Sequence, residues 1–256
     1  MTIEHEAPLA LVTGGHRRLG GVISAALARK GYRLAVHGSH DVALDPELEE
    51  ALSATGAIWH GFVADFELPD AAVRLMQEIV GHYGQVPDLL VNSAAIFGQD
   101  RLEIATSSEL MRHYAVNCVA PVQLTRFLAE DSASRNDRAV INILDQRLAN
   151  PHGDQLSYTL AKQALAGFTK IAAKELAPKN IRVNGVAPGL TLATDDYTPD
   201  QVARNAAMMP LGRLPQPDQI AEAVCFLAQA GAVTGQVIAV DCGAHLNSYE
   251  RDFMHL

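Results

Sequence analysis

Short apolar runs alternate with longer amphipathic segments along the whole chain. The runs are rich in Val, Ile and Leu and contain few polar residues, which is typical of strands buried on both faces of a parallel sheet. We expect strands at Leu9–Val12, Arg33–His37, Ile58–Val63, Leu89–Val91, Val140–Leu144, Arg182–Val186 and Val237–Val240.

The segments between these runs have helical periodicity, near residues 20–30, 46–54, 69–83, 107–130, 157–177 and 217–229. A strand–helix alternation over the whole length predicts an α/β fold, namely one doubly wound parallel sheet (a Rossmann fold) with helices on both faces. We expect a single domain over residues 1–256. Residues 190–216 are rich in proline and follow no clear period, so we expect a loop or a short helix there that forms a lid over a substrate.

Composition narrows the class of protein. The chain has 256 residues, of which 48% are hydrophobic and 19% charged, which suits one domain with a sizeable core. The net charge of −9 argues against nucleic acid as a partner. The apolar runs are far shorter than the roughly 20 residues that span a bilayer, and the acidic N-terminus does not resemble a signal peptide. Three widely spaced cysteines and ten histidines without a ligand motif predict a cytoplasmic protein with no metal site.

A glycine-containing turn, Thr13-Gly14 to Gly20, joins the first predicted strand to the first helix. Small residues let the backbone turn tightly, and the free N–H groups of a helix N-terminus bind phosphate. Because the turn follows the first strand of a doubly wound pattern, we expect a dinucleotide site here. Arg18 stands where a third glycine is expected, and its guanidinium has the reach to contact a pyrophosphate or a substrate.

The end of the second strand bears on the choice of cofactor. An NAD site usually has Asp or Glu at this point, whereas this chain has Ser39 and His40, with Asp41 slightly beyond. Ser39 and His40 have side chains that can hydrogen-bond a 2′-phosphate. We therefore expect NADP(H) in preference to NAD(H), with NAD(H) as the alternative. For His40, an ordinary polar turn residue is an equally good interpretation.

Polar and small residues also follow the third and fourth strands. Asp65 is placed to accept a hydrogen bond from an adenine amino group, and the Asn92–Ala95 segment lets the backbone approach the adenosine ribose. Phe97 follows at the end of the same strand. We expect its ring to stack on a flat ligand, although an isolated phenylalanine is more often part of a core.

Tyr158 and Lys162 form a Tyr-x-x-x-Lys motif, which on a helix places a phenol and an ammonium one turn apart on one face. A neighbouring cation favours the phenolate, so we expect a pKa for Tyr158 below its reference value of about 10. Asp145 lies thirteen residues before Tyr158. A carboxyl at this place, where a carbonyl reductase would carry a neutral hydroxyl, points away from simple alcohol–ketone chemistry.

Together these motifs resemble the short-chain dehydrogenase/reductase family over essentially the whole chain. Within that family the chain is most similar to pteridine reductases, including bacterial dihydromonapterin and dihydrofolate reductases. Arg18, Asp145 and Phe97 carry this closer resemblance, and the segment Ala187–Thr191 agrees with it. The segment after the second strand lacks the arginine that many members use for the 2′-phosphate.

The resemblance implies hydride transfer from NADPH to a C=N bond of a dihydropterin, with a proton delivered to the ring nitrogen by Tyr158 and Asp145. It implies that Lys162 holds the nicotinamide ribose and that Asn117 holds a water linking Lys162 to solvent. Phe97 would stack the pterin against the nicotinamide, and Arg18 would bind both the pterin edge and the phosphates. The implied catalytic residues are Asn117, Asp145, Tyr158 and Lys162, and the implied substrate-binding residues are Arg18, Phe97, Asp145 and Tyr158.

The cofactor contacts expected from the motifs and the resemblance come from the loops at the ends of five strands and from the Tyr-x-x-x-Lys helix. They are Thr13, Gly14, His16, Arg17, Arg18, Leu19, Gly20, His37, Ser39, His40, Asp65, Phe66, Asn92, Ser93, Ala94, Tyr158, Lys162, Pro188, Gly189 and Leu190.

Members of the resembled family are usually tetrameric, so we expect a homotetramer in which the C-terminal residues 249–256 help to close a site across an interface. Two other functions remain open. One is a reductase or dehydrogenase of the same fold acting on a ketone or alcohol of a sugar, acyl group or steroid, which needs neither Arg18 nor Phe97. The other is a non-catalytic NADP-binding regulator, against which the complete Asn117, Tyr158 and Lys162 set argues.

Overall fold

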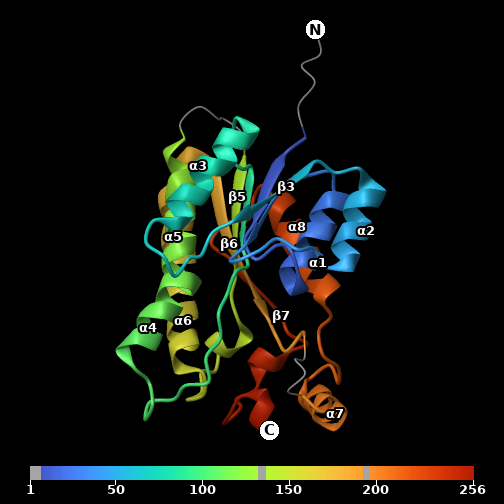
Figure 1. The fold of residues 1–256 in the computed structure, drawn as a ribbon. Coiled ribbons are helices and arrows are strands. Elements are labelled where there is room, and N and C mark those ends of the chain that lie inside the picture. Colours follow the sequence, from blue (N-terminus) through green and yellow to red (C-terminus); the bar gives the residue numbers. More distant parts are fainter. Residues whose placement is uncertain (1–6, 132–136, 193–196) are drawn as a thin grey trace.

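Parallel strands form one central sheet in the computed structural model, which describes residues 7–131, 137–192 and 197–256 (Figure 1). Its strands are β1 (Leu9–Val12), β2 (Arg33–Gly38), β3 (Trp59–Val63), β4 (Leu89–Asn92), β5 (Arg138–Ile143), β6 (Ile181–Pro188) and β7 (Val237–Val240). Their order across the sheet is β3-β2-β1-β4-β5-β6-β7. The direction of winding reverses between β1 and β4, and ligands of such sheets bind in the crevice that this reversal opens beyond the strand ends.

Helices cover both faces of the sheet, as Figure 1 shows. One face packs on α1 (Arg18–Arg29), α2 (Pro46–Thr55) and α8 (Pro217–Gln229). The other packs on α3 (Ala71–Tyr83), α5 (Ala120–Glu130) and α6 (Leu156–Leu176). Each face therefore has its own apolar core. The strands β1, β2, β4, β5 and β6 between these cores are almost entirely buried, which explains their largely hydrophobic sequence, whereas the edge strands β3 and β7 are partly exposed.

The predicted doubly wound fold is confirmed, and each predicted strand lies within two residues of an observed one. The long helix expected at 107–130 is interrupted: α4 (Ser107–Tyr114) continues into α5 through the π-helical residues Ala115–Val119. Such π-helical turns within a helix often mark functional sites. Here the interruption contains the buried Asn117.

The predicted lid at 190–216 contains the short helix α7 (Pro199–Met208), while residues 193–196 lie outside the described part of the chain. A capping box begins the helix: Thr198 accepts a hydrogen bond from the backbone of Gln201, whose side chain in turn accepts from the backbone of Thr198. The lid function itself stays a prediction.

The C-terminal tail, residues 249–256, packs on its own chain. Its expected part in closing a site across an interface stays a prediction. Phe253 is buried beside Met209 and Cys242. The α7 side chains of Gln201 and Asn205 donate hydrogen bonds to the backbone of the tail at Met254 and Phe253, at 3.2 and 3.1 Å. Figure 1 shows α7 and the tail together at the end of the molecule where the strands terminate.

A search for membrane spans among the described residues finds no helix with the length and apolar character to cross a bilayer.

The turn between β1 and α1 leaves no room for a side chain at Gly20. A Cβ atom on Gly20 would lie 2.0 Å from the carbonyl oxygen of Gly14, whereas a Cβ on Gly21 would meet nothing closer than 3.6 Å. We expect Gly20→Ala to lower the free energy of unfolding by about 1–3 kcal/mol, the usual effect of overpacking. Gly21→Ala, the matched control, should leave it unchanged or raise it by up to about 1 kcal/mol, because alanine favours helix. Urea unfolding of the two variants distinguishes these effects, and equal midpoints would contradict the close approach.

Candidate active site

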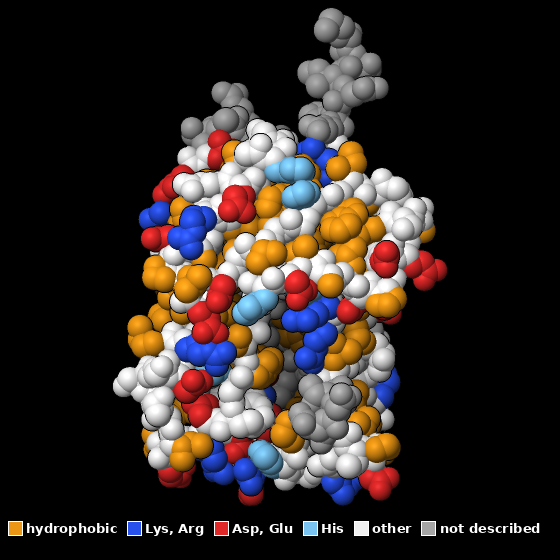
Figure 2. Space-filling view, in the orientation of Figure 1, with side chains coloured by type: hydrophobic (Ala, Val, Ile, Leu, Met, Phe, Trp, Pro, Cys, Tyr) orange, Lys and Arg blue, Asp and Glu red, His pale blue; other side chains and the backbone are white. Residues whose placement is uncertain are grey.

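A cavity of about 660 Å³ opens at the carboxyl ends of the strands. The turn after β1, the loops after the next strands and the C-terminal tail all contribute to its wall. Figure 2 shows a hollow in this face of the molecule with Lys and Arg side chains beside it. The volume lies within the range of small-molecule sites, and the position is where a doubly wound sheet binds ligands.

His37, at the end of β2, fixes the glycine turn. The backbone N–H of Gly14 donates to Nδ1 of His37 at 3.2 Å, and Nε2 of His37 lies 2.8 Å from the carbonyl oxygen of Ala64. Only the neutral tautomer with hydrogen on Nε2 satisfies both contacts. Burial lowers the pKa of His37 to about 4, and its ring stacks on Phe66. His37 therefore holds the loops of the cofactor end together and supplies no charge to a phosphate.

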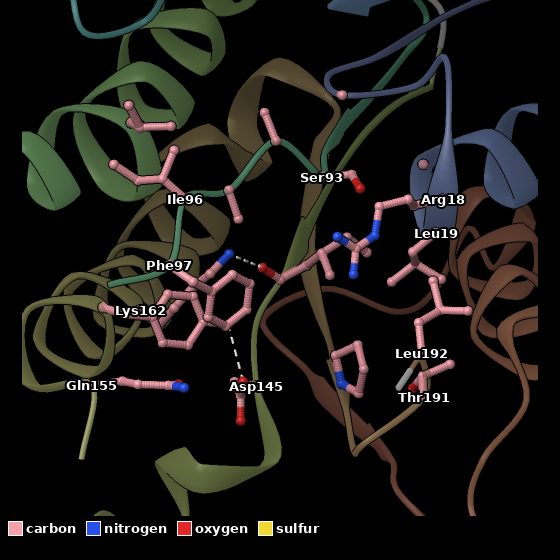
Figure 3. Close-up of a pocket in the computed structure, with 18 of the residues that line it drawn as sticks. Arg18, Leu19, Ser93, Ile96, Phe97, Asp145, Gln155, Lys162, Thr191 and Leu192 are labelled. Carbon is pink, nitrogen blue, oxygen red and sulfur yellow. Dashed lines mark hydrogen bonds between the residues drawn. The ribbon is translucent and has the colours of Figure 1, made fainter. Parts of the chain in front are cut away.

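Arg18 has a glycine-like backbone. Its φ is +52°, in the left-handed region that side chains with a Cβ rarely adopt. This explains why a glycine was expected from the sequence at this position. The backbone N–H of Arg18 donates to Oδ2 of Asp45 at 2.6 Å, which helps to hold the strained conformation. Figure 3 shows the Arg18 side chain reaching into the cavity from the side opposite Phe97.

Three predicted residues lie behind the cavity wall and shape its loops. Oγ1 of Thr13 accepts hydrogen bonds from the backbone of Ser93 and Ala94, both at 3.0 Å. The side-chain amide of Asn92 donates to Asn142 at 2.8 Å. The Asn117 side chain bonds twice to the backbone of Ile96. The other predicted residues all line the cavity: Gly14, His16, Arg17, Arg18, Leu19, Gly20, His37, Ser39, His40, Asp65, Phe66, Ser93, Ala94, Phe97, Asp145, Tyr158, Lys162, Pro188, Gly189 and Leu190.

The loop after β4 is fastened on both sides of Phe97. The Asn117 side chain accepts from the N–H of Ile96 and donates to its carbonyl oxygen, both at 3.0 Å. Asp100 accepts hydrogen bonds from the backbone and the hydroxyl of Ser157, at the start of α6. The structure thus uses the Asn117 side chain to hold this loop, and its predicted role in holding a water stays a prediction.

Between these two anchors, the Phe97 ring stacks on the Tyr158 ring with centroids 4.2 Å apart. Rings at this separation leave no room for a ligand between them. Phe97 is nevertheless 58% exposed, so its outer face is open. A flat ligand can therefore stack on the outer face of Phe97 only.

The three residues expected to move protons lie together (Figure 3). The Tyr158 hydroxyl donates to Oδ2 of Asp145 at 3.0 Å. Nζ of Lys162 donates to the carbonyl oxygen of Ile143 at 2.6 Å and lies 5.8 Å from the centre of the Tyr158 ring. The α6 helix thus presents Tyr158 and Lys162 to the end of β5, where Asp145 follows.

Our expectation that Lys162 lowers the pKa of Tyr158 is wrong for this arrangement. Burial raises the pKa of Tyr158 well above its ordinary value, and the negative charge of Asp145 raises it further. Burial also lowers the pKa of Lys162, to about 8. The sequence spacing indicated the neighbourhood of the two groups, but it carried no information on the loss of solvent around both.

Several cavity residues were missed from the sequence. Arg147 is buried, forms an ion pair with Asp145 and has its Cζ atom 5.3 Å from the centre of the Tyr158 ring. Gln155, Asp252, Phe253 and Met254 also line the cavity. No motif marks these residues, although the position of Arg147 two residues after Asp145 was a signal that could have been used.

Across the described ranges, no group of three or more His, Cys, Asp or Glu side chains is arranged to hold a metal ion.

Comparison with known proteins places this geometry in context. A family model described as enoyl-(acyl carrier protein) reductase matches residues 15–245. Carbonyl reductase family member 4 of Xenopus tropicalis is 34% identical over 92% of this chain and 97% of its own length. The human 3-oxoacyl-[acyl-carrier-protein] reductase is 31% identical over 92% and 97%, respectively.

Two solved structures are also similar, both of FolM alternative dihydrofolate reductase 1 in complex with NADP. The protein from Brucella suis is 32% identical with a TM-score of 0.83, and the match covers 96% of this chain and 98% of that one. The protein from Brucella canis is 33% identical with a TM-score of 0.84, and the match covers 96% of both chains.

The left-handed backbone of Arg18 leads to a prediction about stability. Arg18→Gly and Arg18→Ala both remove the guanidinium, but only glycine adopts a φ of +52° without steric strain. We expect the glycine variant to be more stable than the alanine variant by about 1 kcal/mol. Denaturant unfolding of the two proteins measures the difference. An alanine variant as stable as the glycine variant would show that the backbone is relaxed.

Burial of Lys162 leads to a pH-dependent prediction. Its pKa is about 8 in the folded protein and 10.5 ordinarily, so between these values the unfolded chain binds more protons and the free energy of unfolding rises with pH. A difference of about 2.5 corresponds to about 3 kcal/mol. We expect the stability of the wild type relative to Lys162→Met to increase by about this amount between about pH 7.5 and pH 10.5. Denaturant titrations across this range measure it, and a constant difference would refute the lowered pKa.

Proposed function

The chain belongs to the short-chain dehydrogenase/reductase family and is an NAD(P)-dependent oxidoreductase, and on this premise we propose that it transfers hydride from NADPH to a C=N bond of a dihydropterin. The observation that carries the proposal is the hydrogen bond between Tyr158 and Asp145 at the edge of a cavity that Arg18 and Phe97 also line. A carboxyl in this position gives the site a second group able to exchange a proton.

The shape and chemistry of the cavity support a flat nitrogen heterocycle as substrate. The open face of Phe97 offers an aromatic stacking surface. The planar guanidinium of Arg18 offers donors that suit the acceptor atoms of a heterocycle. The Brucella proteins of similar structure carry the name alternative dihydrofolate reductase, which agrees with a dihydropterin such as dihydromonapterin, dihydrobiopterin or a dihydrofolate.

The cofactor end supports NADP(H). Arg17 and Arg18 line the cavity, and no described residue forms a hydrogen bond or ion pair with either guanidinium. Ser39 and His40 lie on the same wall after β2. These groups would hold the phosphates, with the pyrophosphate at the N-terminus of α1. NADP is the cofactor bound in the two similar Brucella structures.

When bound, the reduced cofactor supplies the hydride, and the protein's own residues manage the proton. In the resting arrangement the Tyr158 hydroxyl gives its hydrogen bond to Asp145, and its raised pKa keeps the proton on the oxygen. Tyr158 would release this proton to the ring nitrogen as that nitrogen gains electron density. Asp145 would then take up a proton from solvent and return it to the Tyr158 oxygen. Lys162, held by the carbonyl oxygen of Ile143, would bind the ribose beside the reacting carbon.

A homotetramer in the cytoplasm completes the proposal. Met111, Tyr114 and Val119, on α4 and the π-helical turn, are apolar side chains exposed at the surface, as are Leu160 and Ile171 on α6. Exposed apolar side chains on adjacent helices are typical of surfaces that associate.

A second candidate function is reduction of a ketone, which the sequence relatives favour because they are named carbonyl and 3-oxoacyl reductases. Such an enzyme would use Tyr158 and Lys162 but would have no need of Asp145. A regulator that binds NADP without turnover has no observation in its favour.

The two functions are separated by measuring NADPH oxidation with dihydromonapterin, dihydrobiopterin, dihydrofolate and a 3-oxoacyl thioester side by side. We expect turnover of at least one dihydropterin. Asp145→Ser should reduce that turnover by roughly 100-fold or more, the usual range for acid–base groups, with little effect on any ketone reduction. Turnover of the thioester alone would refute the pterin proposal. Pterin turnover that Asp145→Ser leaves unchanged would remove Asp145 from the proton path.

A further inference from the structure

The C-terminal tail reaches the Tyr158–Asp145 pair through one buried guanidinium. Arg147 lies between two carboxylates: its Nη2 donates to Oδ2 of Asp252 at 2.8 Å, and its Nε donates to Oδ1 of Asp145 at 3.3 Å. The side chains of Arg147 and Asp252 are 7% and 6% exposed. Asp252 is 105 residues from Arg147 in the sequence, so the fold brings the end of the chain to the proton-transfer site.

The guanidinium is held on three sides. In addition to the two carboxylates, its Nη1 donates to Oε1 of Gln155 at 2.7 Å, just before α6. The donors of an arginine form a rigid planar fork, so three acceptors from different segments fix the orientation of the group. A guanidinium with a fixed orientation also fixes the orientation of the Asp145 carboxylate that it binds.

Asp145 divides its two oxygens between different partners. Oδ1 accepts from both the backbone N–H and Nε of Arg147, at 2.9 and 3.3 Å. Oδ2 accepts from the Tyr158 hydroxyl. Because Arg147 occupies Oδ1, the carboxylate plane is set so that Oδ2 faces Tyr158.

Asp252 is in turn anchored, so the tail can act as a fixed support. Its backbone N–H donates to Oδ2 of Asp154 at 2.9 Å, and its Oδ1 accepts from the N–H of Met254 at 3.0 Å. The neighbouring Phe253 is buried against the base of α7. This leaves Oδ2 of Asp252 directed at Arg147.

We propose that Asp252 and Arg147 are positioning residues of the active site, through which the C-terminal tail orients Asp145 toward Tyr158. This inference rests on the proposed function only for the identity of the substrate. The geometry applies to any reaction in which Tyr158 gives up a proton. Loss of the Asp252 carboxylate would leave Nη2 of a buried arginine without its acceptor, and the guanidinium would then reorient and release Asp145.

The charge of Asp252 also affects the pKa of Tyr158, which a role in packing alone would not do. The charged or titratable groups around the pair are Asp145, Arg147, Lys162, Asp252 and the two loop residues His152 and Asp154. Asp252 raises the pKa of Tyr158, and Arg147 lowers it. Tyr158 must hold its proton in order to deliver it, so activity should be lost at the alkaline pH where Tyr158 ionises. Removal of the Asp252 charge should lower the pKa of Tyr158, and this alkaline loss of activity should then begin at lower pH.

The test compares Asp252→Asn with Arg251→Gln. The first keeps the shape of the side chain, removes its charge and leaves one acceptor oxygen for two donors, Nη2 of Arg147 and the N–H of Met254. The second removes the charge of Arg251, a more exposed tail residue that pairs with Asp154, and leaves the Asp252 contacts with Asp154 and Arg147 in place. We expect Asp252→Asn to lower kcat by roughly 10-fold to 100-fold, as misplaced catalytic groups do, with an unchanged KM for NADPH. Its alkaline limb should shift to lower pH, whereas Arg251→Gln should match the wild type in kcat and pH profile.

Two results would overturn the positioning role. One is wild-type kcat and pH profile in Asp252→Asn. The other is an equal loss in Arg251→Gln, which would assign the effect to packing of the tail. Should Asp252→Asn fail to fold, Arg147→Lys provides the second test: lysine keeps the charge but lacks the fork, so kcat should fall while the alkaline limb stays in place. An unchanged kcat in that variant would be equally decisive against the proposal.

Failure of the proposed function can be recognised separately. If the wild type reduces a ketone and no dihydropterin, the same variants are measured with the ketone. Without any turnover, an ultraviolet difference titration against Tyr158→Phe still reports the ionisation of Tyr158, which should occur at lower pH in Asp252→Asn than in the wild type. An unshifted titration would contradict the proposal.

Discussion

Burial of an all-parallel sheet on both faces is the constraint on which the rest of the structure depends. Both faces are buried only if helices cover each side of the sheet. Each connection between parallel strands must then begin at the edge where the strands end. All the loops after the strands therefore gather at one end of the molecule. The reversal of winding between β1 and β4 separates these loops and leaves the cavity. The polar chemistry is confined to this edge because the interior of the sheet has no place for it.

The same burial determines how the site handles charge. Tyr158 and Lys162 both sit where water is excluded, and for each the ionised form is disfavoured: the tyrosine holds its proton more tightly and the lysine less tightly. His37 is kept neutral by the same effect. Burial thus keeps Tyr158 and His37 uncharged and makes the charge on Lys162 easier to lose.

The parts of the site that depend on local spacing were predictable from the sequence. The turn after β1 and the four-residue spacing of Tyr158 and Lys162 follow from the geometry of a strand–turn–helix and of one helix, and the prediction placed both correctly on their elements. Arg147 and Asp252 were not recognised because their contact depends on how the chain end returns over 105 residues, which no local pattern encodes. The direction of the Tyr158 pKa was misjudged for a related reason: the sequence gives neighbours along a helix, but solvent exclusion depends on every loop that covers the helix.

The position of the tail has a practical consequence for anyone who handles the protein. The carbonyl oxygen of Leu256 accepts a hydrogen bond from Arg204 of α7, and the residues just before it form part of the cavity wall. An affinity tag or fusion partner joined after Leu256 would have to leave from this packed surface, next to the entrance used by ligands. β1 begins at the opposite end of the molecule, far from the cavity (Figure 1). The amino end is therefore the better place to attach foreign sequence, because an attachment there lies away from the cavity wall.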